Sequence, residues 1–146
     1  MELTSSGGYR EQLDRVRRLL EVIEGHRHRS DVEFKDHMWS FFQHCWHLID
    51  WLQHDRLASE GQKQAVKTKV HASALLAMCR DLCSGTRHAG LKTLPRPGAP
   101  RAAASMDCLV HDGFGNLISG KKLARDCLAE WLRILESQRL ATARLT

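Results

Sequence analysis

The segment from residue 79 to residue 91, CRDLCSGTRHAGL, carries the side chains best suited to chemistry in this chain. It ends a predicted helix with a glycine and brings Arg80, Arg87 and His88 close together, with Asp81 nearby. Such a cluster could hold a phosphate by charge and use the imidazole as a general acid or base. The alternative is that Arg87 and His88 interact with the last carbonyls of their helix, as cations do at that end. Spacing alone favours this alternative.

A second pair of candidates, His47 and Asp50, lies one turn apart on the helix that is predicted to come before this segment. Side chains at this spacing on a helix can interact. The pair could form a buried polar contact, or it could support a functional site. The spacing favours the buried contact and leaves the functional role open.

Several histidines follow one side of the same helix and form a stripe with a tryptophan. The stripe consists of His37, His44, His47, Trp51 and His54, which return to similar directions around the helix axis. One interpretation is a face for a homodimer or another protein partner. The other is a metal site, with ligands drawn from His44, His47, Cys79, Cys83 and His88. None of these spacings is a known zinc pattern, so we predict neither a metal nor a cofactor.

Hydrophobic periodicity predicts the elements that must position these residues. Helices are expected at about 9–25, 31–55, 60–84 and 121–139, with a loop at 89–105 and a β-hairpin at 106–119. The second helix should contribute the largest core stripe, formed by Phe34, Met38, Phe41, Phe42, Cys45, Leu48, Ile49 and Leu52. Of its tryptophans, Trp39 and Trp46 are expected in the core. The predicted fold is a mainly α four-helix bundle with a short hairpin before the last helix.

Length and composition narrow the class of protein. The 146 residues suit one domain spanning 1–146, and no apolar run is long enough to suggest a membrane span. No basic segment followed by an apolar one begins the chain, so a cytoplasmic protein without membrane contact is expected. The five cysteines include no CxxC pair and are predicted to be reduced. No phosphate-binding loop, dinucleotide fingerprint or nucleophile elbow is present.

The positive charge of the chain is concentrated in one stretch. Residues 61–101 hold eight Lys or Arg against one acidic residue, whereas residues 31–60 hold two against six. A concentrated basic stretch is typical of a polyanion-binding surface, although it could equally dock on the acidic stretch. The residues expected to contact nucleic acid are Lys63, Lys67, Lys69, Arg87 and Lys92.

Two sequence patterns together resemble a known group of proteins. CWHLIDWL in one helix and MCRDLCSGTRHAGL at the end of the next are similar to a group of small prokaryotic helical proteins with a WHLxDW…DLxxGxxH pattern. That group is in turn similar to the HEPN superfamily, whose members are helical bundles. Many of them are metal-independent ribonucleases, commonly dimers, in toxin-antitoxin and phage-defence systems. The resemblance covers the middle of the chain and, loosely, the last helix.

The resemblance implies roles for individual residues. His88 would be the general acid or base, Arg80 or Arg87 the phosphate anchor, and His47 with Asp50 a supporting pair. Ser84 matches the polar residue of the HEPN motif, with three residues between it and His88, whereas Cys83 stands where the motif has arginine.

Three functions are therefore expected, in descending order. The first is an HEPN-like protein that binds RNA or cleaves it without a metal. The second is a non-catalytic interaction or dimerisation module that uses the face of His37, His44, His47 and Trp51. The third is a metal-binding protein.

Overall fold

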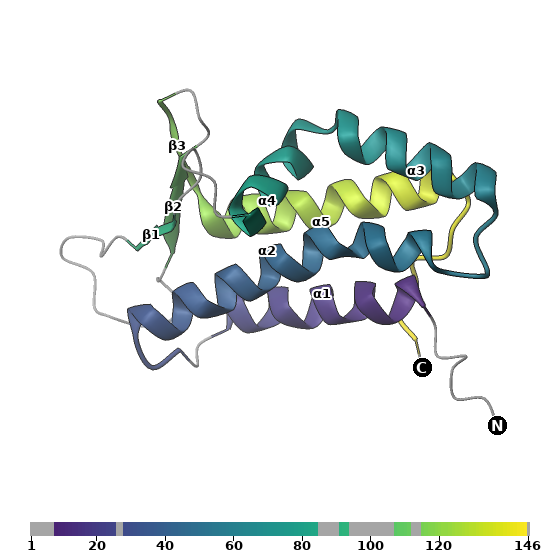
Figure 1. Ribbon diagram of the computed structural model, residues 1–146. Coiled ribbons are helices and arrows are strands. Elements are labelled where there is room, and N and C mark those ends of the chain that lie inside the picture. Colours follow the sequence, from purple (N-terminus) through teal and green to yellow (C-terminus); the bar gives the residue numbers. More distant parts are fainter. Residues whose placement is uncertain (1–7, 26–27, 85–90, 94–106, 112–114, 146) are drawn as a thin grey trace.

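The structure is a computed structural model that describes residues 8–25, 28–84, 91–93, 107–111 and 115–145. Within these residues the chain forms five helices and three strands (Figure 1). They are α1 (Tyr9–Glu24), α2 (Asp31–Gln53), α3 (Glu60–Ala72), α4 (Ala74–Ser84), β1 (Leu91–Thr93), β2 (Cys108–His111), β3 (Leu117–Ser119) and α5 (Gly120–Ser137). The mainly α class is confirmed, but the described residues contain five helices instead of the predicted four.

Helices α1 and α2 lie side by side and pack closely (Figure 1). The apolar face of α1 buries Leu13, Val16 and Ile23 completely. Ser30 caps the start of α2, because its Oγ accepts a hydrogen bond from the backbone N–H of Glu33 at 3.1 Å. A single short connection therefore sets the two helices against each other.

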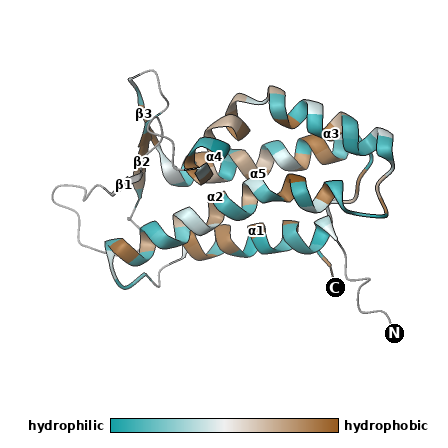
Figure 2. Ribbon diagram, in the orientation of Figure 1, coloured by the Kyte–Doolittle hydropathy of each residue, from teal (hydrophilic) through white to brown (hydrophobic). Residues whose placement is uncertain are grey.

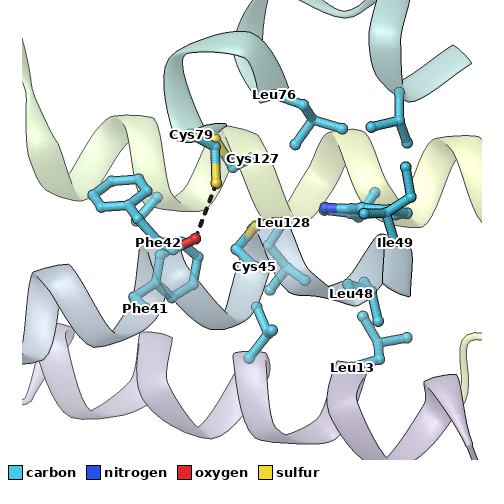
Figure 3. Packing of buried hydrophobic residues seen from close by; sticks show 14 of the residues in the cluster. Leu13, Phe41, Phe42, Cys45, Leu48, Ile49, Leu76, Cys79, Cys127 and Leu128 are labelled. Atoms are coloured by element: carbon cyan, nitrogen blue, oxygen red, sulfur yellow. Dashed lines mark hydrogen bonds between the residues drawn. The ribbon is translucent and has the colours of Figure 1, made fainter. Parts of the chain in front are cut away.

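The core stripe predicted for α2 is confirmed. All eight of its residues are at most 7% exposed, and they pack against residues of α1, α4 and α5 (Figure 3). Trp39 and Trp46, by contrast, are only partly buried and lie against the edge of this core, as Trp51 does. The prediction that the first two tryptophans are core residues was therefore too strong, since they flank the stripe instead of lying within it.

The helix predicted over 60–84 is wrong in one respect, because it is broken at Ser73 into α3 and α4. Ser73 has extended backbone angles, φ −84° and ψ 122°. Its Oγ donates a hydrogen bond to Glu130 Oε2 at 2.7 Å and accepts one from the Leu76 N–H at 3.2 Å. The hydroxyl thus caps the start of α4, and the contact with α5 holds the break in place.

The three strands form one antiparallel sheet in the order β1-β2-β3. The hairpin predicted over 106–119 is confirmed as β2 and β3, with Val110 opposite Ile118. Strand β1 corrects the prediction of a loop over 89–105, because Leu91 pairs with Val110 on the other edge of β2. A three-residue strand carries too little pattern to be recognised among prolines and glycines.

The sheet is joined to the start of α5 by one carboxylate. Asp107 Oδ1 accepts hydrogen bonds from the N–H groups of Cys108 at 2.8 Å and Lys121 at 3.0 Å, and its Oδ2 accepts one from Ser119 Oγ. Gly120, at the first position of α5, has no room for a side chain because Cys108 fills that space. These contacts fix the sheet against the end of α5.

Hydrophilic and hydrophobic residues alternate around the helices (Figure 2). Among the described residues, no helix is both long enough and apolar enough to cross a membrane. The five cysteines are free thiols, of which all but Cys83 are buried. Cys45, Cys79 and Cys127 come from three helices and meet in the core, where Cys79 Sγ donates to the Phe42 carbonyl at 3.3 Å (Figure 3).

Candidate functional site

The site begins where the C-terminal third of α2 faces the end of α4. His47 Nδ1 lies 3.0 Å from Asp50 Oδ2 on the same helix, and His47 Nε2 lies 3.8 Å from Cys83 Sγ on α4. With Nδ1–H donating to the carboxylate, Nε2 carries the lone pair and faces α4. This contact joins the His47 and Asp50 pair to the segment that begins at Cys79, both of which were predicted to carry functional residues.

Both members of the His47 and Asp50 pair lie on the surface. Their side chains are 53% and 64% exposed. The buried polar contact that spacing favoured is therefore not what the structure contains. The pair is instead an oriented imidazole that a ligand in solution can reach, which is the arrangement required of a general base.

Cys83 is the only half-buried thiol among the five cysteines. Burial, with a further contribution from the Asp50 carboxylate, raises the pKa of the Cys83 thiol. The thiol is therefore mainly protonated at neutral pH, and its nucleophilic form is disfavoured. Although the order Cys83, His47 and Asp50 resembles a nucleophile, base and orienting acid, this environment suits acid-base chemistry by His47 better than attack by sulfur.

Arg80 and Ser84 lie on the same helix as Cys83, α4, and contact other residues. The Arg80 guanidinium stacks over the Trp46 ring at 5.9 Å and pairs with Asp81 at 3.5 Å. Ser84 Oγ donates to the carbonyl oxygen of Asp81 at 3.3 Å. The structure thus brings His47 and Asp50 together and places Cys83 beside His47, whereas the contacts of Arg80 and Ser84 described here are with Trp46 and Asp81. The other predicted residues, Arg87 and His88, lie outside the described residues.

An open cavity of about 460 Å³ adjoins His47 on its other side, between α1 and α2. It is lined by Gln12, Arg15, Gln43, His44, His47 and Trp51. The Arg15 guanidinium lies 5.5 Å from the centroid of the Trp51 ring. The cavity therefore combines a cation, an aromatic face and imidazole groups, which suit an anionic ligand with a flat ring.

Sequence reasoning did not find the contribution of α1 to this cavity. Gln12 and Arg15 lie on consecutive turns of α1, and Gln12 Nε2 donates to the His44 carbonyl at 2.9 Å. Periodicity placed them outside the apolar stripe of α1. It could not tell which helix they would face, since that depends on how α1 rolls against α2.

The predicted histidine stripe is divided into separate environments. His44 and His47 line the cavity with Trp51, whereas His37 pairs with His28 through their Nδ1 atoms at 3.0 Å. His54 Nδ1 donates to the Asp50 carbonyl at 2.8 Å. A single continuous histidine face is therefore not formed.

The predicted basic residues are spread along α3 and beyond. Lys67 and Lys69 are exposed, whereas the Lys63 side chain is 12% exposed and pairs with Glu60 at 3.7 Å. Lys92 lies on β1, paired in register with Leu109. Lys67 and Lys69 are thus the described residues of this set that are best placed to contact an anion in solution.

Of the metal ligands considered from the sequence, His88 lies outside the described residues, and Cys79 is separated from the others by its burial. Cys79 is buried and donates to a core carbonyl, whereas Cys83 faces His47 near the surface. In the described part of the chain, the side chains that could hold a metal ion are different ones, namely His28, Glu33 and His37.

No protein-family model, curated protein or solved structure matches this chain. The resemblance to the HEPN superfamily therefore stays a prediction. The function of the chain is therefore inferred from the contacts of His47 with Asp50 and Cys83 and from the cavity beside them.

Proposed function

We propose that this protein binds RNA and cleaves it without a metal, at a surface that we call the α2 face. The α2 face consists of Arg15, Gln43, His44, His47, Asp50, Trp51, Cys83 and Ser84. One observation carries the proposal. The exposed His47 imidazole is oriented by Asp50 and lies between the cavity and the end of α4, from which the segment of Ser84 to His88 continues.

The chemistry assigned to His47 is proton transfer. Its Nε2 would take the proton of a ribose 2′-hydroxyl, and that oxygen would attack the adjacent phosphorus while the bond to the 5′-oxygen breaks. His88 would give the leaving oxygen its proton, in the role that the resemblance implies. The products would be a 2′,3′-cyclic phosphate and a free 5′-hydroxyl. The two histidines account for both proton transfers, so the reaction balances without a metal or cofactor.

The cavity supplies a means of holding the substrate. An unstacked base could pack on the exposed part of Trp51, and the Arg15 guanidinium beside it could contact a phosphate. Lys67 and Lys69 on α3 would attract the phosphates of the RNA, whatever its base sequence. Arg80 would serve as the phosphate anchor if its guanidinium left the ion pair with Asp81 and bound a phosphate of the substrate.

Cleavage of labelled RNA in the presence of a chelator tests the catalytic part. We expect His47→Ala to lower the rate by about 100-fold or more, as loss of a general base does. Asp50→Asn should lower it by about 10-fold, because Nδ1 loses its carboxylate partner. His54→Ala, an exposed histidine one turn beyond Asp50, is the matched control and should keep the rate.

The same assay with His88→Ala, Arg80→Ala and Ser84→Ala tests the residues at and beyond the end of α4. The binding part is tested by titrating RNA at increasing salt, where phosphate contacts require affinity to fall. A wild-type protein that neither cleaves RNA nor binds it in a salt-dependent manner would contradict the proposal.

A non-catalytic interaction module is the second candidate. It is supported by the partly buried Trp51, which lines an open cavity that could receive a side chain of a second copy or of another protein. Light scattering over a range of concentrations tests self-association. A dimer that is lost in Trp51→Ala but kept in His37→Ala would locate the interface at the cavity.

A further inference from the structure

A second group of side chains lies at the start of α2, outside the α2 face. Glu33 and His37 are four residues apart on the first turns of α2, so they lie on one side of that helix. His28 reaches them from the connection between α1 and α2. One ligand atom from each of the three side chains lies within 4.8 Å of the others.

The separation of the two imidazoles fits a shared metal ion. The Nδ1 atoms of His28 and His37 are 3.0 Å apart. Two nitrogens bound to one zinc ion at about 2.0–2.1 Å stand about 2.8–3.0 Å apart at a right angle and about 3.3–3.4 Å apart at the tetrahedral angle, so a small rotation of either ring would suit a tetrahedral ion. In the absence of an ion, a hydrogen bond from His37 Nδ1–H to His28 Nδ1 gives the same distance, so metal binding itself must be measured.

A contact on the other side of the His28 ring orients the imidazole. Its Nε2 lies 3.3 Å from the Ile23 carbonyl oxygen, to which an Nε2–H donates. That tautomer leaves the lone pair of Nδ1 directed toward His37. Histidines that bind metals generally donate their other N–H to a carbonyl or carboxylate in this way, which fixes the ring. The ring is also held by an edge-on contact with Phe34, at 5.0 Å between centroids.

From this arrangement we propose that His28, Glu33 and His37 bind a divalent transition-metal ion, with Zn²⁺ as the best match. Two imidazoles and one carboxylate are a ligand set that zinc accepts, leaving a fourth position for water. Binding would replace the proton on His37 Nδ1, so one proton is released for each ion bound. The site would tie the end of α1 to the start of α2, at the end of the molecule away from both termini (Figure 1).

This site is independent of the proposed RNA chemistry. His37 and His47 are ten residues apart on α2, which corresponds to about 15 Å along the helix. Zinc at the first site would therefore affect stability, and cleavage of RNA with a chelator present would continue without it.

Zinc content after dialysis and the absorption of bound Co²⁺ test the proposal. We expect one Zn²⁺ per chain, a rise in melting temperature with Zn²⁺, and a Co²⁺ spectrum without a thiolate charge-transfer band. Glu33→Gln and His37→Ala should each weaken binding by about tenfold or more, since loss of even an outer partner of a ligating histidine costs about 10- to 100-fold. Glu33→Gln keeps the size of the side chain, so its effect reports on ligation and not on packing.

Two controls separate this site from other zinc binding. His111→Ala removes an exposed histidine of β2, and Cys83→Ser removes the thiol beside His47. Both variants should bind Zn²⁺ as the wild type does. The proposal is overturned if the wild type binds no stoichiometric zinc, if Cys83→Ser abolishes binding, or if His111→Ala weakens it as much as His37→Ala.

Discussion

At the scale of single residues, two histidines of α2 show how neighbours decide the chemistry of an imidazole. His47 donates to a carboxylate and has the Cys83 thiol 3.8 Å from its other nitrogen, whereas His37 meets the nitrogen of a second histidine. The first arrangement suits proton transfer and the second suits metal binding. Residue type is the same in both, and the difference comes from what each ring contacts.

The cysteines differ in their exposure, and this predicts their reactivity. In the native protein we expect an alkylating agent at neutral pH to modify Cys83 alone, and more slowly than a free cysteine, because its raised pKa lowers the thiolate fraction. All five thiols should react in denaturant. Mass spectrometry of digested protein checks this, and a buried cysteine such as Cys79 that reacts as fast as Cys83 would contradict the packing.

Ionisation of the buried Cys108 thiol should make the free energy of unfolding fall at alkaline pH. Burial raises the pKa of its thiol from 9.0 to about 12. The folded state therefore favours the protonated thiol, so its contribution to stability is complete below pH 9 and is lost as pH rises towards 12. We expect the free energy of unfolding to fall less steeply between pH 9 and 11 in Cys108→Ala than in the wild type.

Urea denaturation at each pH measures that slope. Cys83→Ala is the control, because Cys83 is far less buried and should change the slope less. Equal slopes in Cys108→Ala and the wild type would show that Cys108 ionises in the folded state without penalty.

At the scale of elements, the boundary between α3 and α4 depends on one hydroxyl. Ser73 ends α3 and caps α4 while it donates to Glu130 on α5. The residues around it are good helix formers, so local preference favours one continuous helix. The break is stable because the contact with α5 and the burial of α4 against α2 outweigh that preference.

Ser73→Ala should therefore lower the free energy of unfolding by about 1–2 kcal/mol, through the lost cap and the lost bond to Glu130. Ser73→Asn keeps an acceptor for the Leu76 N–H and should recover part of the loss. Chemical denaturation measures both. Thr68→Ala, at an exposed position of α3, is the control and should stay within about 0.5 kcal/mol of the wild type.

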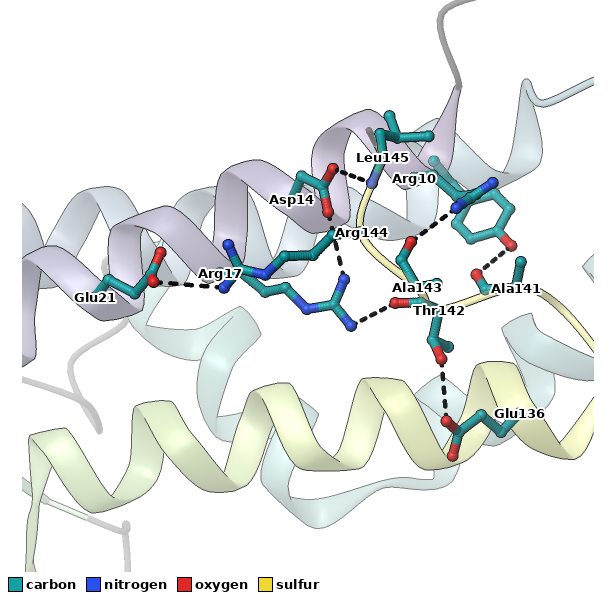
Figure 4. Close-up of polar contacts among 11 residues, drawn as sticks. Arg10, Asp14, Arg17, Glu21, Glu136, Ala141, Thr142, Ala143, Arg144 and Leu145 are labelled. Carbon is teal, nitrogen blue, oxygen red and sulfur yellow. Dashed lines mark hydrogen bonds and ion pairs between the residues drawn. The ribbon is translucent and has the colours of Figure 1, made fainter.

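At the scale of the whole molecule, the end of the chain returns to α1 and secures it (Figure 4). Tyr9 Oη donates to the Ala141 carbonyl at 2.6 Å, and Arg10 donates to the Ala143 carbonyl at 2.8 Å. In the other direction the Leu145 N–H donates to Asp14 at 2.9 Å. Residues more than 120 positions apart are thereby joined.

Removal of residues 141–146 should lower the free energy of unfolding by about 1–3 kcal/mol, since several bonds to α1 are lost together. Tyr9→Phe removes one of these bonds and should cost about 1 kcal/mol. Thermal and chemical denaturation compare the two variants. If the truncated protein were as stable as the wild type, the tail would not contribute to holding α1.

The sequence by itself determined the elements whose apolar spacing is long and regular. The core stripe of α2 and the pairing of β2 with β3 both follow from local pattern, because burial and strand pairing act over a few residues. The sequence also identified His47 and Asp50 as able to interact, since residues three apart on a helix lie on the same side of it.

Only the tertiary structure decided which of these groups share a surface. The contact of Cys83 with His47, the cavity that Arg15 completes, and the approach of His28 to His37 depend on how helices roll and where connections turn. The break at Ser73 depends on a partner in α5. Such contacts join residues distant in the chain, and spacing carries no information about them, because many packings bury the same apolar stripes equally well.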